Sequence, residues 1–289
     1  MRRSKLKILI LAATATILGA FAAVWSIAGL LTEPAPQTIG SLPSDLAGRS
    51  VQFQSTSGST IHGWFVPGKP GTGAVALMHG VRSNRLSMLE RARFLSHAGY
   101  TVLLFDFQAH GESAGKHITF GSLESKDAQA AIHFLHENVP GEKVGVIGVS
   151  LGGAAVALSS PPLSVDAAVL EMVYPTIDEA TDNRITMRLG RWSQVLVPLL
   201  LLQLPPRLGI SRNDLRPIDH VGKMPFPKLF IAGANDKHTT LEESNRLYET
   251  ASKPKEFWVI QNAAHEDLHN ASRVEYEQRI LEFFRKYLR

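Results

Sequence analysis

Short apolar segments alternate with amphipathic patterns along most of this 289-residue chain. Runs of about five apolar residues bounded by turn residues predict buried strands, and apolar residues spaced three or four apart predict helices. The predicted strands are Val51–Ser55, Thr60–Val66, Ala74–Met78, Thr101–Phe105, Lys143–Ile147, Ala167–Glu171, Lys228–Ala232 and Glu256–Ile260. The predicted helices are Leu86–His97, Ser122–Asn138, Ala154–Leu158 and Val274–Leu288. This alternation predicts an α/β fold with a mostly parallel sheet and helices on both of its faces.

One segment interrupts the alternation. About fifty residues separate two predicted strands at residues 174–223, where a single crossover helix needs far fewer. The segment contains an apolar stretch, Val195–Leu202, that is too short and too broken by proline to span a membrane. We expect a cap insertion, which either packs its apolar side on the rest of the domain or forms a lid over a binding site.

The N-terminus carries a long stretch without charge. Ile8–Leu31 spans 24 residues, or about 36 Å as a helix, and follows four basic residues. The pattern predicts an uncleaved signal-anchor helix at residues 1–31 that makes a single membrane pass and places the main domain on the extracytoplasmic side. The alternative is a cleaved signal peptide and a secreted or periplasmic protein. The expected organisation is an anchor at 1–31, a linker at 32–48 and one domain at 49–289.

Charge and composition exclude several classes of function. The net charge of +4 comes from the four basic residues before the apolar stretch, because the remaining 26 basic residues equal the 26 acidic ones. No basic surface is left to neutralise phosphates, so we expect no nucleic-acid partner. The chain has no cysteine, no phosphate-binding loop and no dinucleotide fingerprint, so we expect no metal and no cofactor. Composition does not predict an oligomeric state.

The segment Gly148–Gly153, with the sequence GVSLGG, places a serine between a predicted strand and a predicted helix. Such a turn exposes the hydroxyl of Ser150 at the edge of a sheet, and the flanking glycines allow the backbones to approach each other. A G-x-S-x-G string alone is weak evidence, because it occurs by chance in roughly one chain in ten of this length. Its interpretation depends on whether the chain also supplies a base and an acid.

Two further residues complete a catalytic arrangement. A serine nucleophile needs a histidine to take its proton and an acid to orient that histidine. Asp236 follows the predicted strand Lys228–Ala232, and His265 follows the predicted strand Glu256–Ile260. The carboxyl ends of parallel strands meet at one edge of a sheet, so Ser150, Asp236 and His265 are predicted to form a catalytic triad.

The tetrahedral intermediate of such a reaction needs two N–H donors for its oxyanion. The N–H of Leu151, at the start of the helix after the serine, is one candidate. The second is the N–H of Val81, in the loop after the strand Ala74–Met78. Asp106, at the end of another strand, is expected to hold the loop 107–113 by accepting backbone hydrogen bonds.

These segments resemble the alpha/beta-hydrolase superfamily, in particular membrane-anchored hydrolases similar to monoacylglycerol lipases and to serine-aminopeptidase-like proteins. The resemblance covers residues 51–289 and rests on five segments in the family's order. They are HGVRSNR, DFQAHGESAG, GVSLGG, GANDKHT and AAHEDL. It implies an alpha/beta-hydrolase fold with Ser150 as nucleophile, Asp236 as acid, His265 as base, and Val81 and Leu151 as the oxyanion hole.

The expected function is therefore that of a serine hydrolase acting on an ester, or on a thioester or amide, through an acyl-enzyme. Its substrate would be a small-molecule or lipid-like ester, and its N-terminal helix would bind a membrane. Two alternatives stay open. One is a serine peptidase of the aminopeptidase type, and the other is a catalytically silent member of the fold that binds a lipid or a partner.

Overall fold

The central element is an eight-stranded sheet with strand order β10-β9-β8-β7-β4-β5-β3-β2, seen in a computed structural model that describes residues 2–289. The first residue of the predicted segment 1–31 lies outside the described residues. The strands are β2 Arg49–Gln54, β3 Thr60–Val66, β4 Ala74–Met78, β5 Thr101–Phe105, β7 Val144–Val149, β8 Ala167–Glu171, β9 Lys228–Gly233 and β10 Lys255–Ile260. All neighbouring pairs are parallel except β2 with β3 and β3 with β5. The predicted mostly parallel α/β fold is confirmed.

Burial along the strands explains the sequence pattern. The central strands β4, β5, β8 and β9 are buried at every residue, whereas the edge strand β2 alternates between exposed and buried positions. A strand covered on both faces needs a continuous apolar run, and an edge strand needs apolar residues only at alternate positions.

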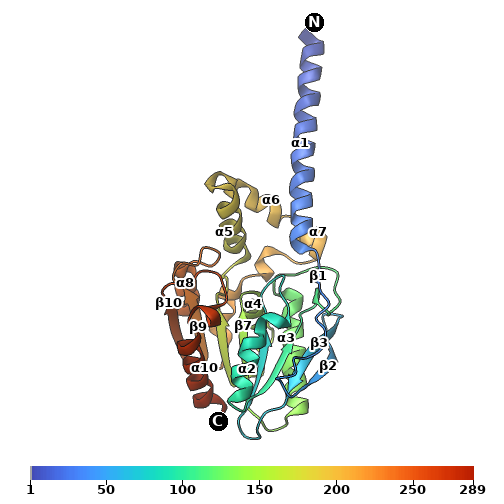
Figure 1. Ribbon diagram of the computed structural model, residues 1–289. Coiled ribbons are helices and arrows are strands. Elements are labelled where there is room, and N and C mark those ends of the chain that lie inside the picture. The colour runs from blue at the N-terminus through green and yellow to red at the C-terminus, as the bar shows by residue number, and fades with distance from the viewer. Residues whose placement is uncertain (1) are drawn as a thin grey trace.

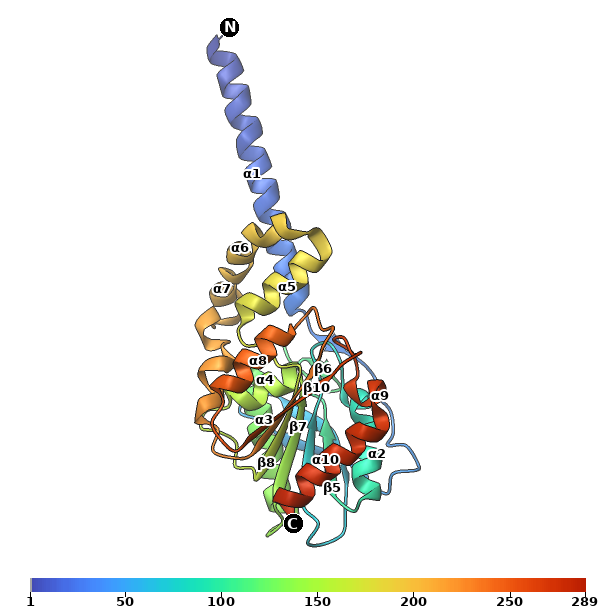
Figure 2. The ribbon, with the colours of Figure 1, turned by 90° about the vertical axis from the view of Figure 1, so that its left-hand side faces the viewer.

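Helices cover both faces of the sheet (Figure 2). On one face lie α2 Leu89–His97, α9 Leu268–Ala271 and α10 Arg273–Leu288. On the other lie α3 Ser122–Asn138, α4 Leu151–Leu158 and α8 Leu241–Thr250. Ile280, Phe283 and Phe284 of α10 are buried in the first layer, as their helical spacing predicts. A short sheet of β1 Ala35–Pro36 and β6 His110–Gly111 lies apart from the main one.

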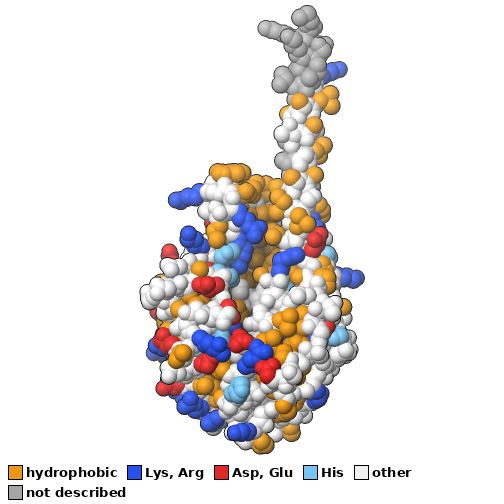
Figure 3. All heavy atoms as spheres, in the orientation of Figure 1, with side chains coloured by type: hydrophobic (Ala, Val, Ile, Leu, Met, Phe, Trp, Pro, Cys, Tyr) orange, Lys and Arg blue, Asp and Glu red, His pale blue; other side chains and the backbone are white. Residues whose placement is uncertain are grey.

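Residues 174–223, which we call the cap segment, contain α5 Ile177–Leu189, η2 Arg191–Leu196, α6 Val197–Leu201 and α7 Leu204–Leu208, followed by short 3₁₀ turns at 212–214, 217–219 and 221–223. The helices α5, α6 and α7 of the cap segment lie beyond the carboxyl ends of the strands, and α6 is beside α1 Arg2–Thr32 (Figure 1). Val197 and Leu201 pack into the core, whereas Val195, Leu199 and Leu202 are exposed. The space-filling view shows a hollow between the cap segment and α1, with hydrophobic side chains along its walls (Figure 3).

The prediction of a membrane anchor is wrong. Within the described part of the chain, no helix has both the length and the apolar character that crossing a bilayer requires. The last turns of the apolar stretch contact the cap segment, where Gln203 donates to the carbonyl of Val24 and the Arg207 guanidinium stacks on the Trp25 ring at 4.1 Å. The transmembrane helix, the membrane partner and the extracytoplasmic localisation all depended on this anchor.

Helix α3 buries a carboxylate that makes stability depend on pH. Burial raises the pKa of Asp127 to about 7, although the Ser55 and Ser57 hydroxyls and the Gln108 N–H lower it in part. Within the described residues its Oδ1 has no hydrogen-bond partner. The folded state thus holds this proton more tightly than the unfolded chain, whose carboxyl has the ordinary aspartate pKa of 3.8, so stability falls as pH rises from about 4 to about 7.

Replacing Asp127 by asparagine should therefore stabilise the fold most at high pH. An asparagine carbonyl can still accept from the Gln108 N–H, which lies 2.9 Å from Oδ2, and it carries no charge. Between pH 5 and pH 8 its advantage over wild type should grow by about 2–3 kcal/mol in urea unfolding. Glu137→Gln, at an exposed position of the same helix, is the control. An advantage of Asp127→Asn that does not change with pH would contradict the assignment.

Candidate active site

Ser150 occupies the turn between β7 and α4. Its backbone has φ of 51° and ψ of −106°, a left-handed conformation that costs energy for any residue other than glycine. Its N–H donates to the carbonyl of Glu171 at 2.8 Å, which fixes the turn against the end of β8. The side chain is buried but for 6% of the residue's surface. Ser150 adopts this strained backbone conformation because the chain turns from β7 into α4 within one residue.

Two glycines make this turn possible. A Cβ on Gly148 would lie 2.7 Å from the backbone carbon of Gly152, so β7 and the first turn of α4 could not approach each other. A Cβ on Gly152 would lie 2.4 Å from the carbonyl oxygen of Met78, so α4 could not pack on the end of β4. The glycines of the GVSLGG segment therefore serve the packing of α4 against two strands.

Asp236 and His265 lie together at the same edge of the sheet. His265 Nδ1 is 2.7 Å from Asp236 Oδ2, and the Asp236 side chain is fully buried. Asp236 Oδ1 accepts from the N–H groups of His238 and Thr239 at 2.7 and 2.9 Å, which fixes the carboxylate. With its Nδ1–H directed to the carboxylate, the imidazole has Nε2 left to act as a base.

Backbone contacts join the two loops that carry these residues. Asn235 N–H donates to the carbonyl of Ala263 at 2.9 Å, and a Cβ on Gly233 would lie 2.5 Å from the same carbonyl oxygen. Ser150 Oγ makes no hydrogen bond to His265 in the described structure. Such bonds are often long in enzymes without substrate and shorten in the complex.

The loop after β4 lies beside Ser150. A Cβ on Gly80 would be 3.8 Å from Ser150 Cβ, so the half-buried Val81 follows a residue that adjoins Ser150. Leu151 is the first residue of α4, so its N–H has no acceptor within the helix. Both candidate oxyanion donors thus come from segments that adjoin Ser150.

Two histidines that sequence reasoning did not single out hold this loop. His79 Nε2 accepts the Phe107 N–H at 3.1 Å, so its Nδ1–H donates to the Gly80 carbonyl at 2.7 Å. His110 Nε2 accepts the Arg82 N–H at 3.0 Å. Burial, with the neighbouring His110, lowers the pKa of His79 to about 3, and burial also lowers the pKa of His110. Both rings are neutral at pH 7, which lets them accept these N–H groups.

Asp106 accepts backbone hydrogen bonds, as the sequence predicts. Its Oδ2 accepts the Glu112 N–H at 3.0 Å and pairs with the buried Arg85 guanidinium at 2.5 Å, while its Oδ1 accepts the Arg85 N–H at 2.7 Å. Asp106 thereby holds the loop 107–113 against the segment that follows the loop after β4.

A buried ion-pair network joins the serine turn to the histidine loop, and no local motif signals it. Arg91 of α2 contacts Glu171 Oε2 at 2.8 Å and Asp267 Oδ1 at 2.7 Å. Tyr276 OH donates to Glu171 Oε1 at 2.5 Å. The Glu171 carbonyl accepts the Ser150 N–H, and Asp267 is two residues from His265, so one guanidinium links the Ser150 turn to the loop that carries His265.

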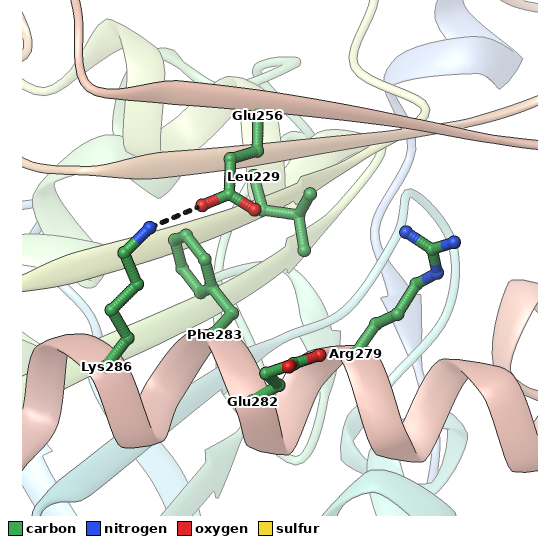
Figure 4. A pocket seen from close by; sticks show the side chains of 6 residues that line it. All are labelled: Leu229, Glu256, Arg279, Glu282, Phe283 and Lys286. Carbon is green, nitrogen blue, oxygen red and sulfur yellow. Dashed lines mark hydrogen bonds and ion pairs between the residues drawn. The ribbon is translucent and has the colours of Figure 1, made fainter.

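A pocket of about 250 Å³ lies elsewhere, between α10 and the strands β9 and β10 (Figure 4). Lys286 and Glu256 form an ion pair of 3.1 Å across it. It includes Leu229 near the start of β9, whereas Asp236 follows the end of that strand. The pocket is therefore separate from the Ser150 site. Among the described residues, no group of three His, Cys, Asp or Glu side chains could hold a metal ion.

Comparison with known proteins finds a matching family model and several relatives. The family model described as serine aminopeptidase, S33, matches residues 69–216. An uncharacterized protein of Mycobacterium tuberculosis, Rv2307c, is 29% identical over 241 residues, covering 81% of this chain and 77% of that protein. A protein of Bacillus subtilis, YqkD, is 25% identical over 233 residues, covering 79% and 76%.

Among solved structures, an esterase of Pyrococcus furiosus has a TM-score of 0.74 at 23% identity and covers 90% of this chain and 99% of its own. An acylaminoacyl peptidase of Pyrococcus horikoshii has a TM-score of 0.64 at 16% identity, covering 83% of this chain and 41% of its own. At these identities the structures show a shared fold.

Proposed function

Because the chain belongs to the serine aminopeptidase S33 family of alpha/beta hydrolases, we propose that it is a serine hydrolase that cleaves carboxylic esters through an acyl-enzyme on Ser150. The observation that carries the proposal is the hydrogen bond of 2.7 Å between His265 and the fully buried Asp236, at the strand ends next to the Ser150 turn. A histidine that merely lies in a surface loop would not be hydrogen-bonded to a buried carboxylate. The substrates would be small-molecule or lipid-like esters.

In the proposed reaction, His265 Nε2 takes the proton of Ser150 Oγ as the oxygen attacks the ester carbonyl. The N–H groups of Leu151 and Val81 stabilise the oxyanion, and the alcohol leaves with the proton from His265. Water then hydrolyses the acyl-enzyme by the same route. The cap segment would act as a lid over this site, and residues 32–48 would link α1 to the catalytic domain.

A fluorophosphonate probe tests the nucleophile. Wild-type protein should be labelled on Ser150, because the probe reacts with an activated serine hydroxyl. Labelling should disappear in Ser150→Ala and persist in Ser164→Ala, whose serine is exposed and outside the site. Labelling retained in Ser150→Ala would disprove the assignment. An unlabelled wild-type protein that also fails to hydrolyse short-chain nitrophenyl esters would favour the catalytically silent alternative.

A peptidase is the second candidate, because the matching family model is described as a serine aminopeptidase. The same triad would then cleave an amide, and the site would also need a group that binds the ammonium of the peptide N-terminus. A panel of aminoacyl-nitroanilides, compared with nitrophenyl esters of increasing acyl length, distinguishes the two. Faster hydrolysis of the anilides would favour the peptidase.

A further inference from the structure

The first helix of the cap segment, α5, is hydrogen-bonded directly to the loop that carries Asp236. Asn183 Nδ2 donates to the carbonyl of His238 at 3.2 Å and to the Glu243 carboxylate at 2.8 and 3.0 Å. Glu179, one turn earlier, pairs with Arg246 of α8. Side chains on this part of α5 therefore lie close to the catalytic acid and its loop.

Arg184 and Arg188 are four residues apart on α5 and share one face of the helix. Arg184 is half-buried, and its guanidinium donates to the Ala180 carbonyl of its own helix at 2.9 Å. In the part of the chain that the structure describes, neither arginine forms an ion pair. Burial lowers the pKa of Arg184, and the negative charges of Asp236 and Glu243 offset this only in part. A guanidinium placed this way gains stability when an anion binds it.

The two carboxylates near Arg184, those of Asp236 and Glu243, already accept hydrogen bonds from other groups. Asp236 accepts hydrogen bonds from His265, His238 and Thr239. Glu243 accepts from Asn183 and from the Thr240 N–H at 2.8 Å. Among the described residues neither is within ion-pair distance of Arg184, so the positive charge of this guanidinium remains available to a ligand.

His238 adds a second unsatisfied group at the same place. Its ring centroid lies 4.9 Å from that of His265, and among the described residues its buried Nδ1 has no hydrogen-bond partner. Burial and the positive charge of Arg184 lower the pKa of His238, so the ring is neutral at pH 7. Lys and Arg side chains also appear at the base of the hollow between the cap segment and α1, below its hydrophobic walls (Figure 3).

We propose that the substrate of this site is an ester that carries a carboxylate, which Arg184 binds with support from Arg188 and His238. The proposal rests on the proposed serine hydrolase function and names its substrate class. A guanidinium binds a carboxylate through two parallel hydrogen bonds, and this geometry gives both affinity and orientation. The same positive charge would repel the ammonium of an aminopeptidase substrate, which favours the ester over the peptide.

Two matched substrate pairs test the proposal. One compares 4-methylumbelliferyl hemiglutarate with its methyl ester, so that the carboxylate lies in the acyl part. The other compares 4-butyryloxybenzoate with its neutral amide, so that the carboxylate lies in the leaving group. In wild type, the charged member of at least one pair should have a kcat/KM about 10- to 100-fold higher.

Arg184→Gln should abolish this preference, so that the ratio of kcat/KM for the charged ester to kcat/KM for the neutral ester falls to about one. Arg184→Lys should keep part of the preference, because it retains the charge but not the planar fork. Arg191→Gln, at an exposed arginine of the same segment, should keep all of it. Equal use of charged and neutral esters by wild type, or a preference that survives Arg184→Gln, would overturn the proposal. Failure of the hydrolase assignment itself would differ, since no ester would be turned over and no probe would label Ser150.

Discussion

Asp236→Asn should lower kcat for ester hydrolysis by about 10⁴-fold while leaving the fold intact. The Asp236 carboxylate accepts the Nδ1–H of His265 at 2.7 Å and so holds the ring in the tautomer whose Nε2 can take a proton. An asparagine carbonyl can still accept the N–H groups of His238 and Thr239. Its NH₂ group would then face His265 and favour the opposite tautomer, which has no base directed at the serine.

Steady-state kinetics with a nitrophenyl ester, together with the thermal unfolding midpoint, separate chemistry from stability. The midpoint should stay within a few degrees of wild type, because the loop hydrogen bonds are kept. Asp219→Asn is the matched control, since Asp219 lies on the surface, pairs with Arg216 and should leave kcat unchanged. A kcat of Asp236→Asn within tenfold of wild type would contradict the role of this carboxylate.

Much of the fold could be predicted because local signals coincide with burial. The strands Thr60–Val66, Ala74–Met78, Thr101–Phe105 and Ala167–Glu171 have the predicted bounds, since apolar runs end there at turn residues. The helix Leu241–Thr250 is not among the predicted helices, although Thr240 and Glu243 form a capping box at its start. The anchor predicted from the apolar N-terminal stretch is wrong, because no helix among the described residues is both long enough and apolar enough to cross a bilayer.

Chain order likewise indicates which loops meet at the sheet edge, and the hydrogen bond between Asp236 and His265 follows from it. Side-chain contacts between segments that are far apart in the sequence do not follow from chain order. Arg91 and Glu171 are 80 residues apart, and each reads as an ordinary helix or strand residue. The proximity of Arg184 to the Asp236 loop depends on how the cap segment folds back, which no local pattern encodes. The pairing of Asp236 with His265 could thus be predicted from the sequence, whereas the contacts that support it could not.

Arg91→Met should destabilise the fold by about 3–5 kcal/mol, because it leaves the fully buried Glu171 carboxylate without its counter-charge. Tyr276 would still donate to Glu171, but one hydrogen bond does not compensate for a buried charge. Asp267 would also lose its partner, so the loop with His265 should become less ordered and kcat of the folded protein should fall. Urea unfolding measures the first effect, and kinetics at low temperature measure the second.

The double variant Arg91→Met with Glu171→Gln separates the two contributions. Removing both charges should recover a large part of the lost stability, since a neutral amide can still accept from Tyr276. Activity should recover less, because Asp267 still lacks its link to α2 and the loop with His265 stays loosely held. Arg93→Met, which removes a more exposed arginine of the same helix paired with Asp45, is the control and should cost under about 1 kcal/mol. If Arg91→Met unfolds within about 1 kcal/mol of wild type, or the double variant is as unstable as the single one, the network does not hold the two catalytic loops together.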